Sequence, residues 1–284
     1  MQVPIKFMLD YARDNNFGVS RFLVSNLESI EAVDGAAENM DSPIIFDIYL
    51  PLMRKSCLIC VEEIAKKFIK TSNFPAALYA DHIESVDECI SVIDRGYDGV
   101  MIDLSKLSLI ENIKGSREVV NYAHKKGVFV EGEVGTITRS SIGKGTETDP
   151  EEAREYVNKS GIDCLAVSIG VHSGFYDNEP DLNYDLIKEL SKTGVHLCLH
   201  GASGLSMGAV RKCIESGMNY TGYGTDPFYK YFSKIDEIRK KEGEKFIDTS
   251  RIIVPARDEM QKEIKTKITI VSIGPGRTET IEIK

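Results

Sequence analysis

Short runs of apolar and β-branched residues recur along the chain, and a longer stretch with helical periodicity follows each of them. There are eight such runs: FLVSN from Phe22, PIIFDI from Pro43, PAALYAD from Pro75, GVMID from Gly99, GVFVEGEVG from Gly127, CLAVSIG from Cys164, HLCLHG from His196 and MNYTGYGTD from Met218. They are almost continuously apolar, as are the strands of a parallel sheet that is buried on both faces. Eight βα units of this kind predict an α/β protein with a (β/α)₈ TIM barrel.

The predicted barrel accounts for most of the chain. We expect a single domain over residues 1–284, with an N-terminal helix, a barrel over about 20–245 and a C-terminal helical extension and tail over about 246–284. A doubly wound open sheet is the main competitor, but the turn after the first strand, VSNLES, lacks the glycines that such a fold requires. The end of the chain alternates like an edge strand from Ile268, and is either an arm that pairs with another subunit or a frayed end.

Charge and hydropathy exclude several classes of protein. The chain has 35 basic and 44 acidic residues and a formal net charge of −9, so it lacks the basic surplus of a nucleic-acid or anionic-membrane binder. No apolar run is long enough to span a bilayer, and the N-terminus does not resemble a signal peptide. We therefore expect a cytoplasmic protein that acts on a small molecule.

Several of the predicted strands end in polar side chains that are costly to bury. Asp81 and His82 end the third strand, Asp103 ends the fourth, and Glu131 and Glu133 lie in the fifth, while the sixth and seventh lead to His172 and His200. In a TIM barrel these ends meet at the rim where the chemistry takes place. Imidazoles from three strands beside a carboxylate are the ligands of a catalytic Zn²⁺, although each histidine alone would also suit a hydrogen-bonded rim residue.

These residues carry a resemblance to a known family. The chain resembles the class II, metal-dependent fructose-bisphosphate and tagatose-bisphosphate aldolases over roughly residues 4 to 265. The matching segments are VSNLESIEAVDGAAENMDSPIIF, YADHIESVDECISVIDRGYDGVMID, VNYAHKKGVFVEGEVGTI, TDPEEAREYVNKSGIDCLAVSIG, LCLHGASGL and GTD. Each segment is generic alone, but their order and spacing are specific.

The resemblance implies a role for each matching residue. It makes His82 and His200 zinc ligands, Asp81 the acid that exchanges the proton of the aldol hydroxyl, and Asp103 a support for a ligand. His172 is the candidate for the family's third zinc histidine. Glu133 is a ligand, a partner of a ligand or an ion-pair residue, and these three readings stay open. The residues implied for substrate phosphate are Gly174, Gly201, Ser203, Gly222 and Thr225.

Four departures from the family pattern affect the substrate and the metal. His172 and Ser173 are exchanged relative to the usual order, so His172 can ligate only if the backbone shifts; otherwise the site has two histidines and Glu133. Asp177 stands near the place of a phosphate-binding Lys, and Gly222 replaces an Asn. The loop after the fifth strand offers only Glu147 as an acid, with the basic residues Arg139 and Lys144 before it. These changes put dihydroxyacetone phosphate as the donor in doubt.

The sequence thus predicts a class II aldolase that makes or cleaves a carbon–carbon bond in a ketose or ketose phosphate through a metal-stabilised ene-diolate. We expect one Zn²⁺ per chain, with Co²⁺ or Mn²⁺ as alternatives, a pKa of Asp81 raised by burial, and Glu147 or Glu133 moving the proton of the donor carbon. The partners would be a sugar substrate and other copies of the chain in a homodimer or homotetramer. Alternatives are a metal-assisted isomerase or hydrolase, or a non-catalytic sugar-ligand binder.

Overall fold

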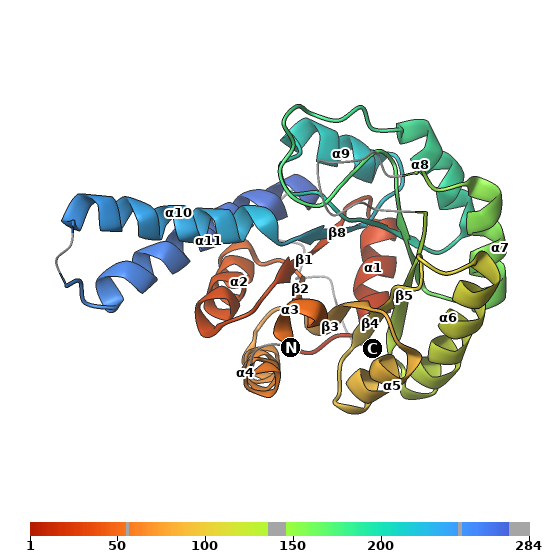
Figure 1. Ribbon diagram of the computed structural model, residues 1–284, viewed down its shortest axis with the longest axis horizontal. Helices are drawn as coiled ribbons and strands as arrows, with labels where there is room; N and C mark the ends of the chain where they lie inside the picture. Colours follow the sequence, from red (N-terminus) through yellow and green to blue (C-terminus); the bar gives the residue numbers. More distant parts are fainter. Residues whose placement is uncertain (55–56, 136–145, 244–245, 273–284) are drawn as a thin grey trace.

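A closed barrel of eight parallel strands forms the centre of the molecule (Figure 1). The computed structural model describes residues 1–54, 57–135, 146–243 and 246–272. The strands are β1 (Val19–Leu23), β2 (Ile44–Tyr49), β3 (Ala76–Ile83), β4 (Gly99–Ile102), β5 (Phe129–Val134), β6 (Cys164–Val167), β7 (His196–Leu199) and β8 (Tyr220–Tyr223). They pair in sequence order, and β8 closes the barrel against β1. The predicted TIM barrel is confirmed.

Helices follow the strands and surround the barrel (Figure 1). They are α1 (Ile5–Asp14), α2 (Leu27–Met40), α3 (Leu50–Met53), α4 (Leu58–Thr71), α5 (Val86–Asp94), α6 (Leu109–Ala123), α7 (Pro150–Ser160), α8 (Tyr184–Leu190), α9 (Met207–Glu215), α10 (Thr225–Glu242) and α11 (Ser250–Val271), with short 3₁₀ turns at His124–Lys126 and Ser191–Thr193. Local signals set their ends. Ser108 caps α6, for example, and Asp149 accepts hydrogen bonds from the first turn of α7, which ends at the left-handed Gly161.

Helix α1 closes the N-terminal end of the barrel. The segment before it pairs with β3, where the Val3 amide donates to the Ala76 carbonyl. Ile5 and Leu9 of α1 are fully buried in a cluster with residues of the barrel interior, among them Tyr79 and Phe129. With this end filled by apolar side chains, the C-terminal ends of the strands are left for a site.

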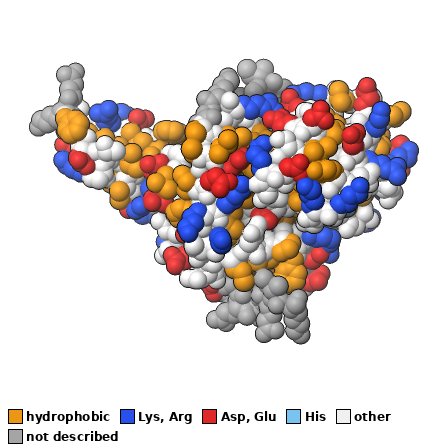
Figure 2. Space-filling view, turned by 90° about the horizontal axis from the view of Figure 1, so that it is seen from below, with side chains coloured by type: hydrophobic (Ala, Val, Ile, Leu, Met, Phe, Trp, Pro, Cys, Tyr) orange, Lys and Arg blue, Asp and Glu red, His pale blue; other side chains and the backbone are white. Residues whose placement is uncertain are grey.

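Helices α10 and α11 project from the barrel as a pair (Figure 1). Helix α11 packs against α10 and α2. Residues 268–271 complete α11 and are not the edge strand that their alternation suggested, and residues after 272 lie outside the described part. Hydrophobic side chains lie along this projecting pair in Figure 2, and Tyr229, Phe232, Phe246 and Val254 are exposed. In the described residues, no helix combines the length and the apolar character that crossing a membrane requires.

Candidate active site

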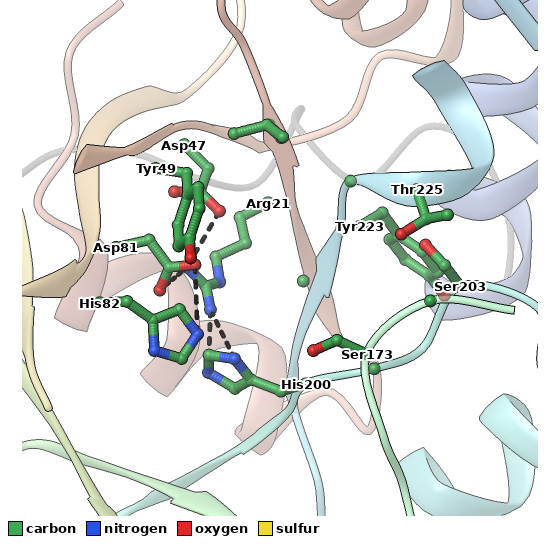
Figure 3. Close-up of a pocket in the computed structure, with 15 residues that line it drawn as sticks. Arg21, Asp47, Tyr49, Asp81, His82, Ser173, His200, Ser203, Tyr223 and Thr225 are labelled. Carbon is green, nitrogen blue, oxygen red and sulfur yellow. Dashed lines mark hydrogen bonds and ion pairs between the residues drawn. The ribbon is translucent and has the colours of Figure 1, made fainter. Parts of the chain in front are cut away.

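A cavity of about 250 Å³ lies at the C-terminal ends of the strands (Figure 3). Its walls bring together eight of the residues that the sequence predicts for the site: Asp81, His82, Gly174, His200, Gly201, Ser203, Gly222 and Thr225. The cavity is also lined by Arg21, Asp47, Tyr49 and Ser173, which the sequence did not single out. One end is therefore ionic, and the other consists of glycine, serine and threonine loops.

A bulge at the end of β3 brings two neighbouring side chains to this cavity. Alternate residues of a strand point to opposite faces, so Asp81 and His82 would separate in a regular strand. The register of β3 against β4 shifts between Ala80 and Ile83, and His82 has a φ of 52°. A left-handed backbone is uncommon for a residue other than glycine and is found often at functional sites.

His82 is held by a carboxylate from the next strand. Its Nδ1 lies 2.8 Å from Oδ2 of Asp103, which also accepts a hydrogen bond from the Ser105 hydroxyl at 2.7 Å. The His82 Nε2 lies 3.8 Å from Oδ2 of Asp81. Burial alone would lower the pKa of His82, but the Asp81 charge and the Asp103 hydrogen bond raise it. His82 thus tends to carry a proton.

His200 points down into the barrel toward a buried acid. Its Nε2 lies 2.7 Å from Oε1 of Glu131, a fully buried carboxylate whose other oxygen accepts a hydrogen bond from the Tyr79 hydroxyl at 2.6 Å. The ring centroids of His82 and His200 are 5.1 Å apart, and the two imidazoles therefore share the ionic end of the cavity.

Arg21, from β1, lies between these groups. Its Nη1 forms ion pairs with Asp81 at 2.7 Å and Asp47 at 3.0 Å, and its Nη2 lies 2.9 Å from the His200 Nε2 (Figure 3). Only 1% of the residue is exposed. The available sequence signal was a charged residue inside an apolar strand: Arg21 in GVSRF, and Asp47 in PIIFDI.

The guanidinium changes the proton affinities expected at the site. Burial alone would raise the pKa of Asp81, but Arg21, His82 and His200 lower it well below its ordinary value. The predicted rise is wrong because the prediction lacked the cation beside the carboxylate. The raised pKa belongs to Asp47 instead, at about 8, because of its burial and the nearby charge of Asp81.

His172 lies apart from the other two histidines. Its Nδ1 is 3.1 Å from the carbonyl oxygen of Ser173, and its ring packs 4.1 Å from the ring of Tyr176. The Tyr176 hydroxyl lies within hydrogen-bonding distance of the carbonyls of His172 and Gly201. Ser173, not His172, lines the cavity, so the structure does not bring the three predicted imidazoles together.

The two candidate carboxylates for the donor carbon also lie in different places. Glu147 accepts a hydrogen bond from the Asn183 amide at 2.9 Å and lines a separate cavity with Asp181 and Asn183. Glu133 is buried close to His82 and Asp103. Asp177 is exposed and does not line the site cavity. Arg139 and Lys144 lie outside the described residues.

Possible metal ligands do come together at this end of the barrel. Among the residues that the structure describes, three groups have one ligand atom per residue within 4.8 Å of the others: Asp81 with His82 and His200, Glu131 with Cys198 and His200, and His82 with Asp103 and Glu133. None of these groups includes His172. Only the first of them has two histidines. Arg21 contacts the first group through Asp81 and His200, and the second group through His200.

The group beside Arg21 does not fit the zinc centre with three imidazoles that the sequence predicts. A divalent ion about 4 Å from a guanidinium would be repelled by about 8 kcal/mol at an effective dielectric constant of about 20. The carboxylates that would attract it already have partners, since Asp81 pairs with Arg21, Asp103 with His82, and Glu131 with His200. The predicted third imidazole points elsewhere. The cation that lies beside Asp81 and His200 in this cavity is the guanidinium of Arg21.

Comparisons with known proteins agree with the fold and with the resemblance. The family model described as fructose-bisphosphate aldolase class-II matches residues 3–274. A fructose-bisphosphate aldolase of Geobacillus stearothermophilus is 32% identical over 274 residues, covering 94% of this chain and 95% of that protein. Another, of Staphylococcus aureus strain Mu50, is 31% identical, covering 94% of this chain and 96% of that protein. Among solved structures, the YdjI aldolase of Escherichia coli K12 superposes with a TM-score of 0.88 at 25% identity, covering 98% of this chain and 100% of that one.

Proposed function

Because the chain belongs to the class-II fructose-bisphosphate aldolase family, we propose that it is an aldolase that makes or cleaves a carbon–carbon bond in a ketose or ketose phosphate. The observation that carries the proposal is the position of Asp81. Its carboxylate lies beside two imidazoles at one end of a cavity whose other end is built from glycine, serine and threonine loops.

In the cleavage direction Asp81 acts as the base. Its carboxylate takes the proton of the hydroxyl group two carbons away from the ketone carbon. The bond between the carbon that bears this hydroxyl and the next carbon, which is attached to the ketone, then breaks. The hydroxyl oxygen becomes the carbonyl of the departing aldehyde, and the electron pair of the broken bond forms an enolate on the other fragment. Because its pKa is low, Asp81 is ionised and ready for this step at neutral pH.

His82 supplies the proton that completes the reaction. Its pKa is raised, which favours the charged imidazole, and its Nε2 lies 3.8 Å from the Asp81 carboxylate in the same cavity. Transfer of this proton to the enolate carbon gives the ketone product. We assign this role to His82 and not to Glu147, because Glu147 lines a different cavity.

The loops after β7 and β8 suit an anionic group at the far end of the substrate. Gly201 and Ser203 follow β7, and Thr225 begins α10, whose N-terminus favours negative charge. The one acid of its first turn, Asp226, is paired with Lys267 and accepts a hydrogen bond from the Gly204 amide. That acid is thereby neutralised, which favours a phosphorylated ketose as the substrate.

The Zn²⁺ predicted from the sequence, and Co²⁺ or Mn²⁺ in its place, do not enter these steps, because the residues do not fit such a centre. The homo-oligomeric state and the cytoplasmic location remain parts of the proposal. The exposed Tyr229 and Phe232 on the projecting helices support the former, since apolar side chains grouped on a surface often mark an interface.

A screen for retro-aldol cleavage tests the proposal. Purified protein is incubated with ketoses and ketose 1-phosphates, and the released aldehyde is measured with a coupled reductase. We expect cleavage of at least one phosphorylated ketose, and Asp81→Asn should lower kcat about 10²- to 10⁴-fold. Asp177→Asn is the matched control, because Asp177 is exposed and away from the cavity, and it should keep the wild-type rate.

Two results of the screen would contradict an aldolase. Turnover of a ketose without aldehyde release, or hydrolysis of an ester, would indicate the isomerase or hydrolase alternative. Tight binding of a sugar phosphate with no turnover, and with equal affinity in Asp81→Asn, would indicate a non-catalytic binder.

A further inference from the structure

We propose that the Arg21 guanidinium is the resident cation of this site: it occupies the position between Asp81 and His200 that a divalent metal would need, and the aldol chemistry proceeds without a metal. The inference rests on the proposed function for its chemistry. Its structural part, that the site excludes a metal, stands on the geometry alone.

The surroundings of Arg21 are those of a site built for one fixed cation. The Asp81 carboxylate lies 2.7 Å from Nη1, and the carboxyl group of Asp47 lies 3.0 Å from it. The guanidinium carbon lies 4.8 Å from the ring centre of Tyr79 and 5.4 Å from that of Tyr220, so two aromatic rings flank it. A buried charge is tolerated only when it has partners of this kind, and Arg21 has them from three different strands.

Gly222 on β8 provides the space for this side chain. A Cβ at this position would lie 3.0 Å from Nε of Arg21 and 3.3 Å from its guanidinium carbon. Any larger residue would therefore crowd the guanidinium at its present position. The glycine on β8 and the arginine on β1 are neighbours in the barrel register, Arg21 opposite Gly222, and they form one unit.

Ser173 lies at the cavity wall where a third imidazole ligand would be needed for a metal. It lines the cavity, but its hydroxyl is a poor zinc ligand compared with an imidazole, and the neighbouring His172 turns toward Tyr176. Two features of the cavity thus act together against a metal. Arg21 places a permanent positive charge in it, and Ser173 leaves the group of Asp81, His82 and His200 without a third imidazole.

A guanidinium in this position can follow the charge of the reaction. During cleavage the proton of the substrate hydroxyl moves to Asp81, and the electron pair of the broken bond becomes an enolate, so one negative charge passes from Asp81 to the enolate oxygen. No oxidant or reductant takes part. Arg21 contacts Asp81 and lines the same cavity, so its charge stabilises the negative charge before and after the transfer.

The metal content of the protein tests the inference independently of activity. Wild-type protein is purified without chelator, dialysed against Zn²⁺ and then against buffer, and analysed by plasma mass spectrometry. We expect less than about 0.1 Zn²⁺ per chain, and no rise in Tm when Zn²⁺ is added, since a metal that binds only the folded state would raise it.

Variants at two positions give the matched comparison. Arg21→Gln removes the charge, Ser173→His adds an imidazole at the cavity, and the double variant should gain about one Zn²⁺ per chain together with a higher Tm in Zn²⁺. Ser173→His alone should stay metal-free because Arg21 is still present. Arg21→Lys keeps a charge and should also stay metal-free, and circular dichroism checks that each variant is folded.

The outcomes separate this inference from the proposed function. About one tightly held Zn²⁺ per wild-type chain, or cleavage that EDTA abolishes and Zn²⁺ restores, would overturn it. Cleavage that survives EDTA in metal-free protein, and that Arg21→Gln lowers at least tenfold, would support it. Metal-free protein with no aldol cleavage of any ketose would contradict the proposed function while still supporting Arg21 as the cation.

Discussion

At the scale of single residues, the site is organised by charges that neighbouring side chains set for one another. Arg21 lowers the pKa of Asp81, and the Asp81 charge in turn raises those of Asp47 and His82. The directions of these pKa shifts could not be predicted from the types of residue at the rim alone. They depend on which carboxylate the guanidinium contacts, and that contact joins strands β1 and β3.

The pH dependence of cleavage follows from these directions. The rate needs ionised Asp81 and protonated His82. It should therefore fall at low pH only below the ordinary Asp value of about 3.9, and at high pH only above the ordinary His value of about 6.5. Asp103→Asn replaces the anionic acceptor that raises the pKa of His82 with a neutral amide, so its alkaline limb should move down toward about 6.5.

A profile of kcat/KM between pH 4 and 10 checks this prediction. Ser105→Ala is the control, since Ser105 contacts Asp103 but leaves the His82 hydrogen bond in place, and its alkaline limb should stay near that of the wild type. An alkaline limb that is the same in Asp103→Asn and wild type would show that His82 is not the acid.

Among the site residues, those at strand ends could be predicted from sequence and those inside strands could not. Asp81, His82 and His200 stand out because polar groups that end apolar runs meet at one rim. Arg21 lies within its strand, and its position facing the barrel interior becomes visible only with the register. The direction of His172 depends on the loop in which Tyr176 packs, which no periodicity specifies.

At the scale of elements, the order of the strands could be predicted from the sequence, but local departures from regular strands and helices could not. All eight apolar runs correspond to strands, because burial on both faces leaves a clear signal. Short helix α3, the bulge in β3 and the helical end of α11 were not predicted. The bulge matters most, since it brings Asp81 and His82 to one cavity, and it is visible only in the register of β3 against β4.

Close packing between β5 and α7 gives a prediction at this scale. Gly132 separates Glu131 from Glu133, and a Cβ there would lie 2.1 Å from the hydroxyl of Tyr156, which bonds to Ser116. Gly132→Ala should therefore lower the free energy of unfolding by about 1 to 3 kcal/mol, measured by urea denaturation.

Two comparisons make that measurement specific. The double variant Gly132→Ala, Tyr156→Phe lacks the clashing hydroxyl and should regain part of the loss. Gly208→Ala on α9 meets only the Ser206 hydroxyl at 3.9 Å, so its stability should be unchanged or higher by up to about 1 kcal/mol. Equal stability of Gly132→Ala and wild type would contradict the packing described here.

At the scale of the whole molecule, the barrel has one filled end, one open end and a projecting pair of helices. Helix α1 occupies the first end, and the site occupies the second. The projecting α10 and α11 carry exposed apolar side chains (Figure 2), a feature that the sequence could not reveal because it depends on which helix faces remain uncovered.

The oligomeric state tests the role of this surface. We expect light scattering on a size-exclusion column to show a homodimer or homotetramer, and Phe232→Glu to shift it toward monomer, because burying an unpaired charge in an interface is costly. Ile59→Glu is the control, since Ile59 is as exposed but lies on α4. A wild-type monomer, or equal dissociation in both variants, would contradict an interface on these helices.

The central claim is that a guanidinium, and not a metal, is the cation beside Asp81 and His200. Crystals grown with Zn²⁺ and measured at the zinc absorption edge test it most directly. We predict no anomalous peak between the imidazoles of His82 and His200, and density for the Arg21 guanidinium within hydrogen-bonding distance of Asp81. A peak about 2.0–2.1 Å from nitrogens of both imidazoles, with Arg21 displaced, would contradict it.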